Sequence, residues 1–466
     1  MRRLSLQRLA LSASIWLAIG ADVHAQSVIP GPGANGGGGP TLRAAGQTPP
    51  QQVTGELIGI ICPASPSILG SDLQARCDEI AVGIIGGGDI SGGLAGLQGM
   101  AAEENSAVQT TEVDASAAQT DELRERLEQR RKEDEEKESA FNVTVDGRRL
   151  TASDLFDTPR GGGASADYAG SGRWGVFLNG NFGLGDKDST ARESGFDLNS
   201  YGVTGGVDYK LTVQSIVGLA VGYTTQDVDL DRNGGKVDTD GVSVSLYGGY
   251  YPSAQSYVNA IVSYAASNHD QERTVAYQIA ALPGGTTTVN QRALSETDSN
   301  EIAGSVEAGY DFYRDRWVLT PYGRFNVAHT EIDGFTERMS SPTAPGSGLA
   351  LQIDEQDFTS ITAAIGGRVA TAIATNSFDL FPQAGVEYVH EFDNDNEDTT
   401  GRLVDDRSGS TFLLPTDEPD RNYGNVSAGL TADFRNGWTA HALYQGLIGY
   451  SDLNVHAFEI GARLDF

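Results

Sequence analysis

The stretch Phe458-Glu-Ile-Gly-Ala-Arg-Leu-Asp-Phe466 decides the fold of this chain. Every second residue in it is apolar, and the residues between are polar or small. A side-chain period of two predicts a β-strand with one apolar and one polar face. A barrel in a bacterial outer membrane needs this pattern, because lipid surrounds it and its lumen is polar. We interpret four apolar residues as its C-terminal assembly signal: Phe458, Ile460, Leu464 and Phe466.

The same pattern recurs upstream, and it is clear in residues 301–313. There Ile302, Val306 and Tyr310 share one face, and Glu301 and Glu307 share the other. From Trp174 onward we expect an all-β domain, a twelve-stranded antiparallel transmembrane barrel. Its predicted strands are 174–184, 198–211, 214–224, 240–251, 255–267, 301–313, 316–329, 357–374, 377–390, 422–434, 437–449 and 455–466.

The connections between these strands alternate in length. Those after the even-numbered strands are tight, as at Thr212-Val213 and Arg314-Asp315. Those after the odd-numbered strands are long: 185–197, 225–239, 268–300, 330–356 and 391–421. Outer-membrane barrels have short periplasmic turns and long extracellular loops. The sequence therefore predicts that both ends of the barrel lie at the periplasmic rim.

Charged residues occupy many of the positions predicted to face the lumen. Pairs of such partly hydrated charges contribute little each, but together they favour a charged helix over an apolar plug in the channel. The lumen-facing charges that we expect are Asp208, Lys210, Glu307, Arg324, Arg368, Glu387, Asp433, Glu459 and Arg463.

The N-terminus has the features of a secretory signal peptide. Arg2, Arg3 and Arg8 precede an apolar core at Leu9–Ala21, and we expect cleavage after Ala25, giving a signal peptide of residues 1–25. After it no apolar run is long enough for a membrane-spanning helix. The net charge of −31 argues against a nucleic-acid partner.

Residues 26–115 form a short, Gly-rich segment that we expect to be largely irregular. Its two cysteines, Cys62 and Cys77, are the only ones in the chain. Outside the cytoplasm, two thiols so close in sequence are most simply a disulfide. The glycines at 86–88 and 92–93 lack the lysine and the strand–helix context of a phosphate-binding loop.

Residues 116–172 are expected to be a helical linker and hinge. The run from Asp121 to Lys132 has strong helix formers and i,i+4 charge pairs, and Leu123 and Leu127 are its only large apolar residues. Two interpretations stay open: a solvated spacer helix, or a helix inside a polar channel. Over 117–139 such a helix is roughly 35 Å long, about the height of a barrel.

Three stretches resemble the β-domain of autotransporters, the type V secretion family: Trp174–Asp188, Gly195–Tyr209 and Val217–Tyr223. The resemblance covers roughly residues 165–466, and the terminal Phe466 agrees with it. It implies a translocator, domain 173–466, in the outer membrane of a Gram-negative bacterium, with an N-terminal passenger at the cell surface. The implied partners are outer-membrane lipid and lipopolysaccharide, the barrel assembly machinery and periplasmic chaperones, and we expect a monomeric barrel.

The sequence departs from the family pattern in two ways. About thirty residues separate the predicted helix from Trp174, so the segment that threads the lumen stays open. The passenger is also too short for a long β-helix or a complete hydrolase. The alternative is a porin-like or adhesive barrel that keeps its N-terminal segment as a plug or a periplasmic extension.

Residues with chemical potential are few, and we expect no enzyme, cofactor or metal site. A lipid-facing hydrolase would need Ser427 and His441 together, yet Ser427 is predicted to face the lumen. A protease at the outer rim would draw on His269-Asp270 and His390-Glu391. The acidic run Asp227–Asp231 has Arg232 where a calcium loop needs glycine.

Overall fold

The computed structural model describes residues 39–63, 68–138, 142–145, 148–151, 173–231, 234–280, 284–375, 377–393, 398–434 and 438–464. The predicted signal peptide 1–25 and Phe466 lie outside these residues. Among the described residues, no helix has both the length and the apolar character needed to cross a membrane.

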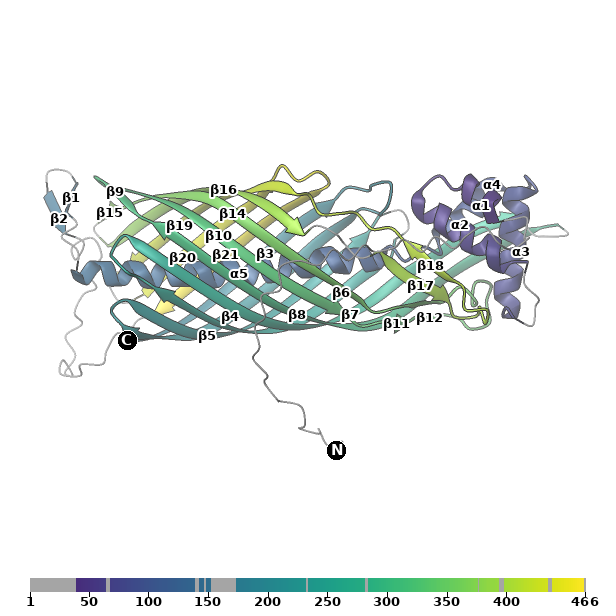
Figure 1. Cartoon of the computed structure of the whole chain (residues 1–466), viewed down its shortest axis with the longest axis horizontal. Helices are drawn as coiled ribbons and strands as arrows, with labels where there is room; N and C mark the ends of the chain where they lie inside the picture. The colour runs from purple at the N-terminus through teal and green to yellow at the C-terminus, as the bar shows by residue number, and fades with distance from the viewer. Residues whose placement is uncertain are drawn as a thin grey trace, which may run out of the picture. The chain divides into compact units, whose positions relative to one another are not determined.

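Twelve long antiparallel strands of the described chain form a closed barrel (Figure 1). The last strand closes it by pairing with the first, from Leu453 opposite Lys187 to Leu464 opposite Val176. The strands, each paired with its neighbour, are β3 (Trp174–Lys187), β4 (Phe196–Thr212), β5 (Ser215–Leu230), β6 (Lys236–Tyr250), β7 (Ser256–Ala280), β8 (Thr286–Tyr310), β10 (Trp317–Ile332), β14 (Gln356–Thr371), β16 (Phe378–Asp393), β19 (Asn422–Phe434), β20 (Trp438–Ile448) and β21 (Leu453–Leu464).

Shorter strands complete the sheets. β9 (Phe312–Arg314), β12 (Arg338–Met339) and β15 (Ile373–Ala374) extend the barrel sheet. β11 (Phe335–Thr336), β13 (Leu351–Ile353), β17 (Thr399–Leu403) and β18 (Thr411–Leu414) form a separate four-stranded sheet. β1 (Asn142–Val145) pairs with β2 (Arg148–Thr151).

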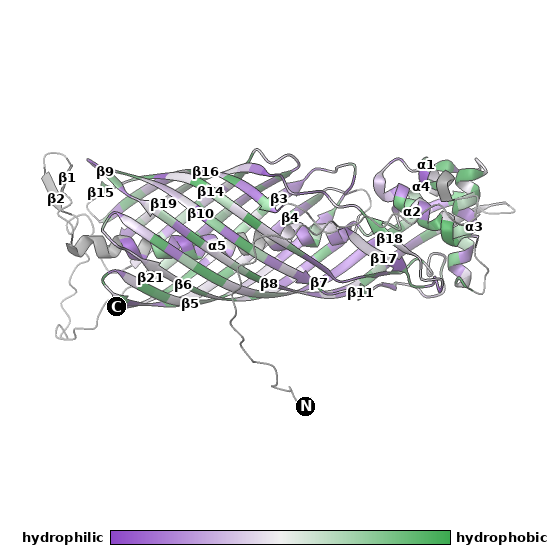
Figure 2. Ribbon diagram, viewed as in Figure 1, coloured by the Kyte–Doolittle hydropathy of each residue, from purple (hydrophilic) through white to green (hydrophobic). Residues whose placement is uncertain are grey.

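The outward face of the barrel is apolar, and hydrophobic residues alternate with hydrophilic ones along its strands (Figure 2). On β21, Phe458 is 43% exposed and Ile460 is 68% exposed, as expected of lipid-facing residues. Exposed aromatic residues lie toward both edges of this apolar face, where such side chains suit the membrane interface. Examples are Tyr201, Tyr223, Tyr264 and Tyr388 toward one edge, and Trp174, Tyr250, Trp317 and Trp438 toward the other.

β7 and β8 are much longer than predicted. Residues 268–300, expected as a loop, belong almost entirely to these two strands. Beyond Tyr264 the outward residues of β7 become polar, with Asn268, Asp270 and Glu272. The period of two persists, but its outward face suits water rather than lipid. The two strands therefore continue past the membrane as a paired extension.

The segment expected to be largely irregular contains four helices: α1 (Gly39–Ala45), α2 (Pro49–Ile61), α3 (Ser71–Ile85) and α4 (Ile90–Gln98). We call residues 39–98 the cap. Apolar residues recur at helical spacing in it, as in Leu73, Cys77, Ile80 and Ile84, all buried. Asp89 caps α4 by accepting a hydrogen bond from the Gly92 amide at 3.0 Å. This spacing outweighs the glycine content that favoured an irregular segment.

The cap packs on the barrel extension and on the four-stranded sheet (Figure 1). Its buried residues form one cluster with Val275, Tyr277, Ile279 and Val289 of the β7–β8 extension. The same cluster includes Leu351, Ile353, Leu403, Phe412 and Leu414 of the four-stranded sheet or its flank. The β7–β8 connection is on the long-loop rim, so the cap sits at that end of the barrel.

The polar helix α5 (Glu104–Glu138) runs through the lumen (Figure 1). It begins well before the predicted start at residue 117. Of the two interpretations left open, the helix in a polar channel is confirmed by its contacts with inward-facing residues of β5, β6 and β7.

Candidate functional site

The lumen holds α5 by a narrow apolar contact on one side. Leu123 and Leu127 are both fully buried and pack against inward residues of β3, β5, β6 and β7. These residues are Phe177 of β3, Ile216 and Ala220 of β5, Tyr247 of β6, Tyr251 directly after β6, and Tyr257 and Ile261 of β7. The Tyr251 hydroxyl also donates to the Leu127 carbonyl at 3.2 Å. The helix therefore packs against the part of the barrel formed by β3–β7. Leu123 and Leu127, the only two large apolar side chains in this part of α5, make the contact.

Asp208 binds two arginines of the helix. Its carboxylate lies 2.6 Å from Arg126 Nη2 and 2.7 Å from Arg130 Nε, and all three side chains are almost fully buried. Gly175 lies against them: a Cβ there would be 2.4 Å from Arg126 Nη2. Buried charges persist only when they are paired, so Asp208 is a fixed anchor for this turn of α5.

Glu307 is the centre of a second charge cluster. It accepts from the Tyr257 hydroxyl at 2.8 Å and from Arg368 at 2.9 Å, and Arg124 Nε of the helix lies 3.3 Å away. Arg368 also pairs with Glu128 of α5 at 2.6 Å. Wall and helix charges thus alternate in sign across this cluster.

The remaining contacts extend the network around the helix. Arg324 pairs with Glu387, and Arg131 of α5 pairs with Asp311. Glu459 accepts from Asn179 at 2.9 Å and lies 2.8 Å from His441 Nε2. The alternation of polar and apolar residues in the strands predicts which charged residues of the barrel face the lumen. No such periodicity predicts which charged residues of α5 pair with them.

The other predicted site residues fall in two groups. Lys210 is buried and Asp433 is half-buried, both on inward positions. Arg463 pairs through its backbone with Thr439, and Leu464 pairs with Trp438; the Arg463 and Leu464 side chains lie outside the described part. The role of the C-terminal residues as an assembly signal stays a prediction.

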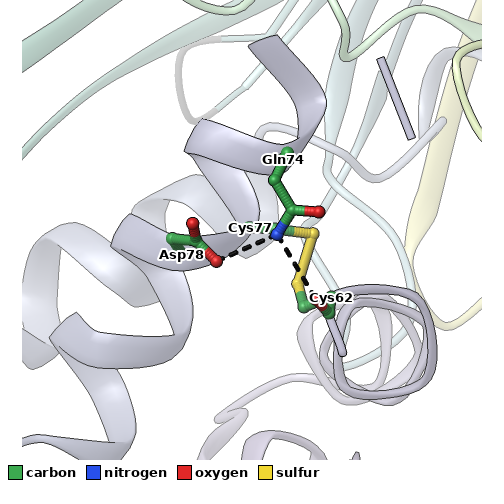
Figure 3. The surroundings of a disulfide bond; sticks show 4 residues. All are labelled: Cys62, Gln74, Cys77 and Asp78. Atoms are coloured by element: carbon green, nitrogen blue, oxygen red, sulfur yellow. Dashed lines mark hydrogen bonds between the residues drawn. A yellow bond between two sulfur atoms is a disulfide. The ribbon is translucent and has the colours of Figure 1, made fainter. Parts of the chain in front are cut away.

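Cys62 and Cys77 form a disulfide between the end of α2 and the middle of α3 (Figure 3). Their Cα atoms are 5.2 Å apart. Gln74 donates to the Cys62 carbonyl at 3.3 Å and to Asp78 at 3.0 Å, which covers one side of the bond (Figure 3). The disulfide closes a short loop inside the cap rather than linking the cap to the barrel.

A buried ion pair fastens the connection between cap and lumen helix. Arg273 of β7 makes two hydrogen bonds to Glu337, at 2.8 and 2.5 Å, and also donates to the carbonyls of Gly99 and Leu349. Burial raises the pKa of the nearby Glu104 carboxyl to about 8, against the opposing charge of Arg273. This cluster was not predicted, because residues 268–300 were expected to form a loop.

The residues considered above as candidates for catalysis or metal binding do not come together in a site. Ser427 pairs with Gln445, whereas His441 pairs with Thr431, so the two are not opposite each other. His269 is buried between Thr239 and Ser299, and His390 contacts Asn422. Within the described ranges no group of three acidic, His or Cys residues is arranged to hold a metal.

The run expected to be an acidic loop is largely strand. Asp227 and Asp229 belong to β5, and they pair with Asp238 and Lys236 of β6. An extended strand cannot wrap its carboxylates around one ion as a calcium loop does.

A family model described as the autotransporter beta-domain matches residues 176–445, more than half of the chain. The chain belongs to the autotransporter family. Its barrel is an outer-membrane β-barrel of autotransporter type, with strands that alternate lipid-facing and lumen-facing residues and with a helix in its lumen.

The chain is similar to several curated proteins, of which two are an esterase and a protease. The chain is 25% identical over 267 residues to "Esterase EstA" of Pseudomonas aeruginosa, covering 56% of this chain and 38% of that protein. It is 24% identical over 315 residues to an extracellular serine protease of Serratia marcescens, covering 67% of this chain and 27% of that protein. This autotransporter thus spans well under half the length of these relatives.

Two solved structures are similar to part of this chain. The translocator domain of NalP from Neisseria meningitidis matches with a TM-score of 0.47 and 16% identity, covering 63% of this chain and 89% of that one. The beta domain of the Bordetella autotransporter BrkA matches with a TM-score of 0.43 and 19% identity, covering 63% and 100%.

Proposed function

We propose that this autotransporter displays its own cap, as a folded helical passenger, on the outer surface of the cell. The observation that carries the proposal is the place of the cap at the long-loop rim. The barrel begins at Trp174 and its last described strand ends at Leu464, both at the opposite, short-turn rim. Short turns of outer-membrane barrels are periplasmic, so the cap rim faces outward.

The passenger stays attached in this proposal. The cap continues through residues 99–103 into α5, and Arg273 binds the carbonyl of Gly99 in this connection. A large apolar cluster also joins the cap to the extension and the four-stranded sheet. We therefore assign residues 39–98 to the passenger and place its boundary with the lumen helix near residues 99–103, upstream of residue 115.

The porin-like or adhesive barrel is the second candidate. The helix that lies in the lumen favours a retained N-terminal segment, which that candidate also requires. The two differ in the side on which the cap lies. Lipid and lipopolysaccharide would contact the barrel in both, and insertion by the barrel assembly machinery with periplasmic chaperones is common to both. We propose a monomeric barrel and no catalytic activity for either.

Protease treatment of intact cells separates these candidates. A tag inserted in the exposed Gly86–Gly88 turn of the cap should be removed from intact cells. The same tag in the exposed turn at Ser253-Ala254 should survive until the outer membrane is permeabilised. Loss of the cap tag only after permeabilisation would contradict surface display.

A further inference from the structure

Strand β7 has an unpaired edge beside the cap. Its pairing with β6 stops at Glu272, which lies opposite Lys236, the first residue of β6. On its other side, β7 pairs with β8 all the way to Ala280. No described strand pairs with residues 273–280 on the β6 side. Where β7 extends toward the cap (Figure 1), one of its two edges therefore has no neighbouring strand.

The backbone groups of every second residue point toward this edge, because successive residues of a strand direct their N–H and C=O groups to opposite sides. The Ala280 amide donates to the Asp89 carboxylate of the cap at 3.1 Å, and the Gln278 carbonyl faces the start of α4. By the same alternation, Thr274 and Ala276 direct their N–H and C=O groups to the free edge. These two residues offer four backbone hydrogen-bonding groups there.

A crevice lies along these four groups. It has a volume of about 550 Å³, which is within the roughly 300–1,000 Å³ of common ligand sites. Thr274 and Ala276 form part of its wall, and one face of α4, with Ile90 and Leu94, forms another. The turn between β5 and β6 lines it as well. A peptide in this crevice would continue the line of β6 beyond Lys236, at the usual spacing of about 4.8 Å from β7.

The edge lacks features that usually prevent the addition of a strand. Natural sheets protect exposed edges with charged side chains, prolines or bulges. Thr274 and Ala276 are uncharged, β7 contains no proline, and its pairing with β8 runs without a shift in register. Ile90, which lines the same crevice, is 52% exposed. These features favour an extended peptide, whose backbone would pair with β7 and whose side chains would cover Ile90.

The charges around the crevice favour a basic peptide. Its acidic lining residues are Glu103, Glu104 and Asp231, and the one basic residue in the described lining is Arg273. Arg273 is paired with Glu337, which balances its charge. Burial raises the pKa of Glu104 to about 8, so this carboxyl is mostly protonated at pH 7. Glu103 and Asp231 therefore leave the crevice with a negative charge, which attracts a basic ligand.

The length of the free edge sets the length of the peptide. Residues 273–277 lie between the end of the pairing with β6, at Glu272, and the contact of α4 with Gln278. At about 3.4 Å per residue they span roughly 17 Å. A segment of about five residues therefore fills the edge.

We propose that this crevice binds an extended, basic peptide segment of a partner protein, which adds to the free edge of β7 as a further strand. Thr274 and Ala276 pair with the backbone of the peptide. Ile90 and Leu94 contact its apolar side chains, and Asp231 attracts its basic ones. The peptide site is a property of the cap and the β7 extension, so it does not depend on the side of the membrane on which the cap lies.

Fluorescence anisotropy of the purified, detergent-solubilised full chain tests this proposal. The probe is a fluorescein-labelled peptide of sequence Lys-Val-Thr-Val-Lys, and its matched control carries methyl groups on alternate backbone nitrogens. We expect the methylated peptide to bind at least roughly tenfold more weakly, because it cannot donate the hydrogen bonds of a strand. A peptide with Glu in place of both lysines should bind at least roughly threefold more weakly at about 0.1 M salt.

A variant of the strand tests the same contact from the side of the protein. Ala276→Pro removes one donor from the free edge and spares the hydrogen bonds with β8, since the Ala276 N–H points away from that strand. It should weaken binding of the lysine peptide at least roughly tenfold. Thr274→Ala is the control, because it keeps both backbone groups and should bind as the parent does. Heat-modified gel migration checks that each variant folds.

Hydrogen exchange shows whether the edge takes up a strand. In the free protein the amides of Thr274 and Ala276 should exchange quickly, whereas those of Arg273 and Val275, which face β8, should exchange slowly. Bound lysine peptide should slow the first pair at least roughly tenfold.

Four outcomes would overturn the proposal. They are absence of binding, equal binding of the methylated peptide, unchanged binding in Ala276→Pro, and slow exchange of the Thr274 and Ala276 amides without peptide. If that slow exchange depends on protein concentration, a second copy of the chain occupies the edge instead of a partner's peptide. All these measurements are made in detergent, so they stand apart from the protease test of surface display.

Discussion

Asp208 is the residue on which the position of α5 most directly depends. Replacing it by Asn removes the one carboxylate with which Arg126 and Arg130 both pair. Breaking a buried pair in this way costs about 3–5 kcal/mol. We expect Asp208→Asn to lower the temperature at which the folded barrel converts to the unfolded form on semi-native gels.

The matched control is Asp238→Asn. Asp238 pairs with Lys236 at 2.5 Å, but both side chains are more than two-fifths exposed. An exposed pair contributes ~0–1 kcal/mol, so this variant should melt close to the parent. Equal melting of the two variants would mean that the lumen charges do not hold the helix.

The raised pKa of Glu104 predicts that the stability of the connection between cap and lumen helix depends on pH. Burial raises this pKa from 4.5 to about 8 in the folded protein. Between these values the folded carboxyl keeps a proton that the unfolded one has lost, so stability falls as the pH rises through this range. We expect the urea midpoint of the helical circular dichroism signal to drop from about pH 5 to about pH 9, and to drop less in Glu104→Gln.

The control for this effect is Glu418→Gln, an exposed residue whose variant should keep the full pH dependence of the parent. If Glu104→Gln responds to pH just as the parent does, the buried carboxyl is not the group responsible.

Helix α4 depends on a close approach to the edge of β7. A Cβ on Gly92 would lie 2.3 Å from the carbonyl oxygen of Gln278 and 2.6 Å from the Asp89 carboxylate. Gly92→Ala forces the helix away from the strand, at a cost of about 1–3 kcal/mol. Limited proteolysis of the detergent-solubilised protein should cut the cap faster, with the barrel unchanged.

Gly88 offers a matched substitution in the same segment. It is exposed, and a Cβ there meets no atom within 4 Å. Gly88→Ala should therefore leave the digestion rate of the cap as it was. A Gly92→Ala protein that digests no faster than Gly88→Ala would contradict the packing of α4 on β7.

At the scale of elements, the alternation of polar and apolar residues was enough to predict the barrel. It did not predict the β7–β8 extension, the cap or the contacts of α5 in the lumen. Residues such as Ile302 and Glu307 alternate because lipid and lumen impose opposite polarity on neighbours in one strand. The β7–β8 extension was missed since its outward residues turn polar, which resembles a loop. The cap was missed because its many glycines concealed the helical spacing of Leu73, Cys77 and Ile80.

For the contacts inside the lumen, the sequence predicts the residues on the barrel side but not their partners on α5. Alternation placed Asp208, Glu307 and Glu387 inward, and they are buried there. A helix that is polar or charged on most of its surface has no apolar stripe, so the sequence does not predict which of its faces contacts which strands. The pairing of Arg126 with Asp208 therefore required the three-dimensional register of α5 against the wall.

For the whole molecule, the fold gives one consistent direction from the cap to the periplasm. The cap lies at the long-loop rim. From that rim α5 runs toward the short-turn rim, near which its Arg130 and Arg131 lie. The first barrel strand begins and the last described strand ends at the short-turn rim. In our proposal this order makes the helix a tether that joins an external domain to the barrel through the lumen.

Cysteine labelling in intact cells tests this arrangement most directly. Ala95 on the cap and Ala254 in a short turn are both exposed, and the two native cysteines are bonded to each other. A membrane-impermeant maleimide should label Ala95→Cys in intact cells, but Ala254→Cys only after the outer membrane is opened. Labelling of Ala254→Cys and protection of Ala95→Cys in intact cells would contradict the account.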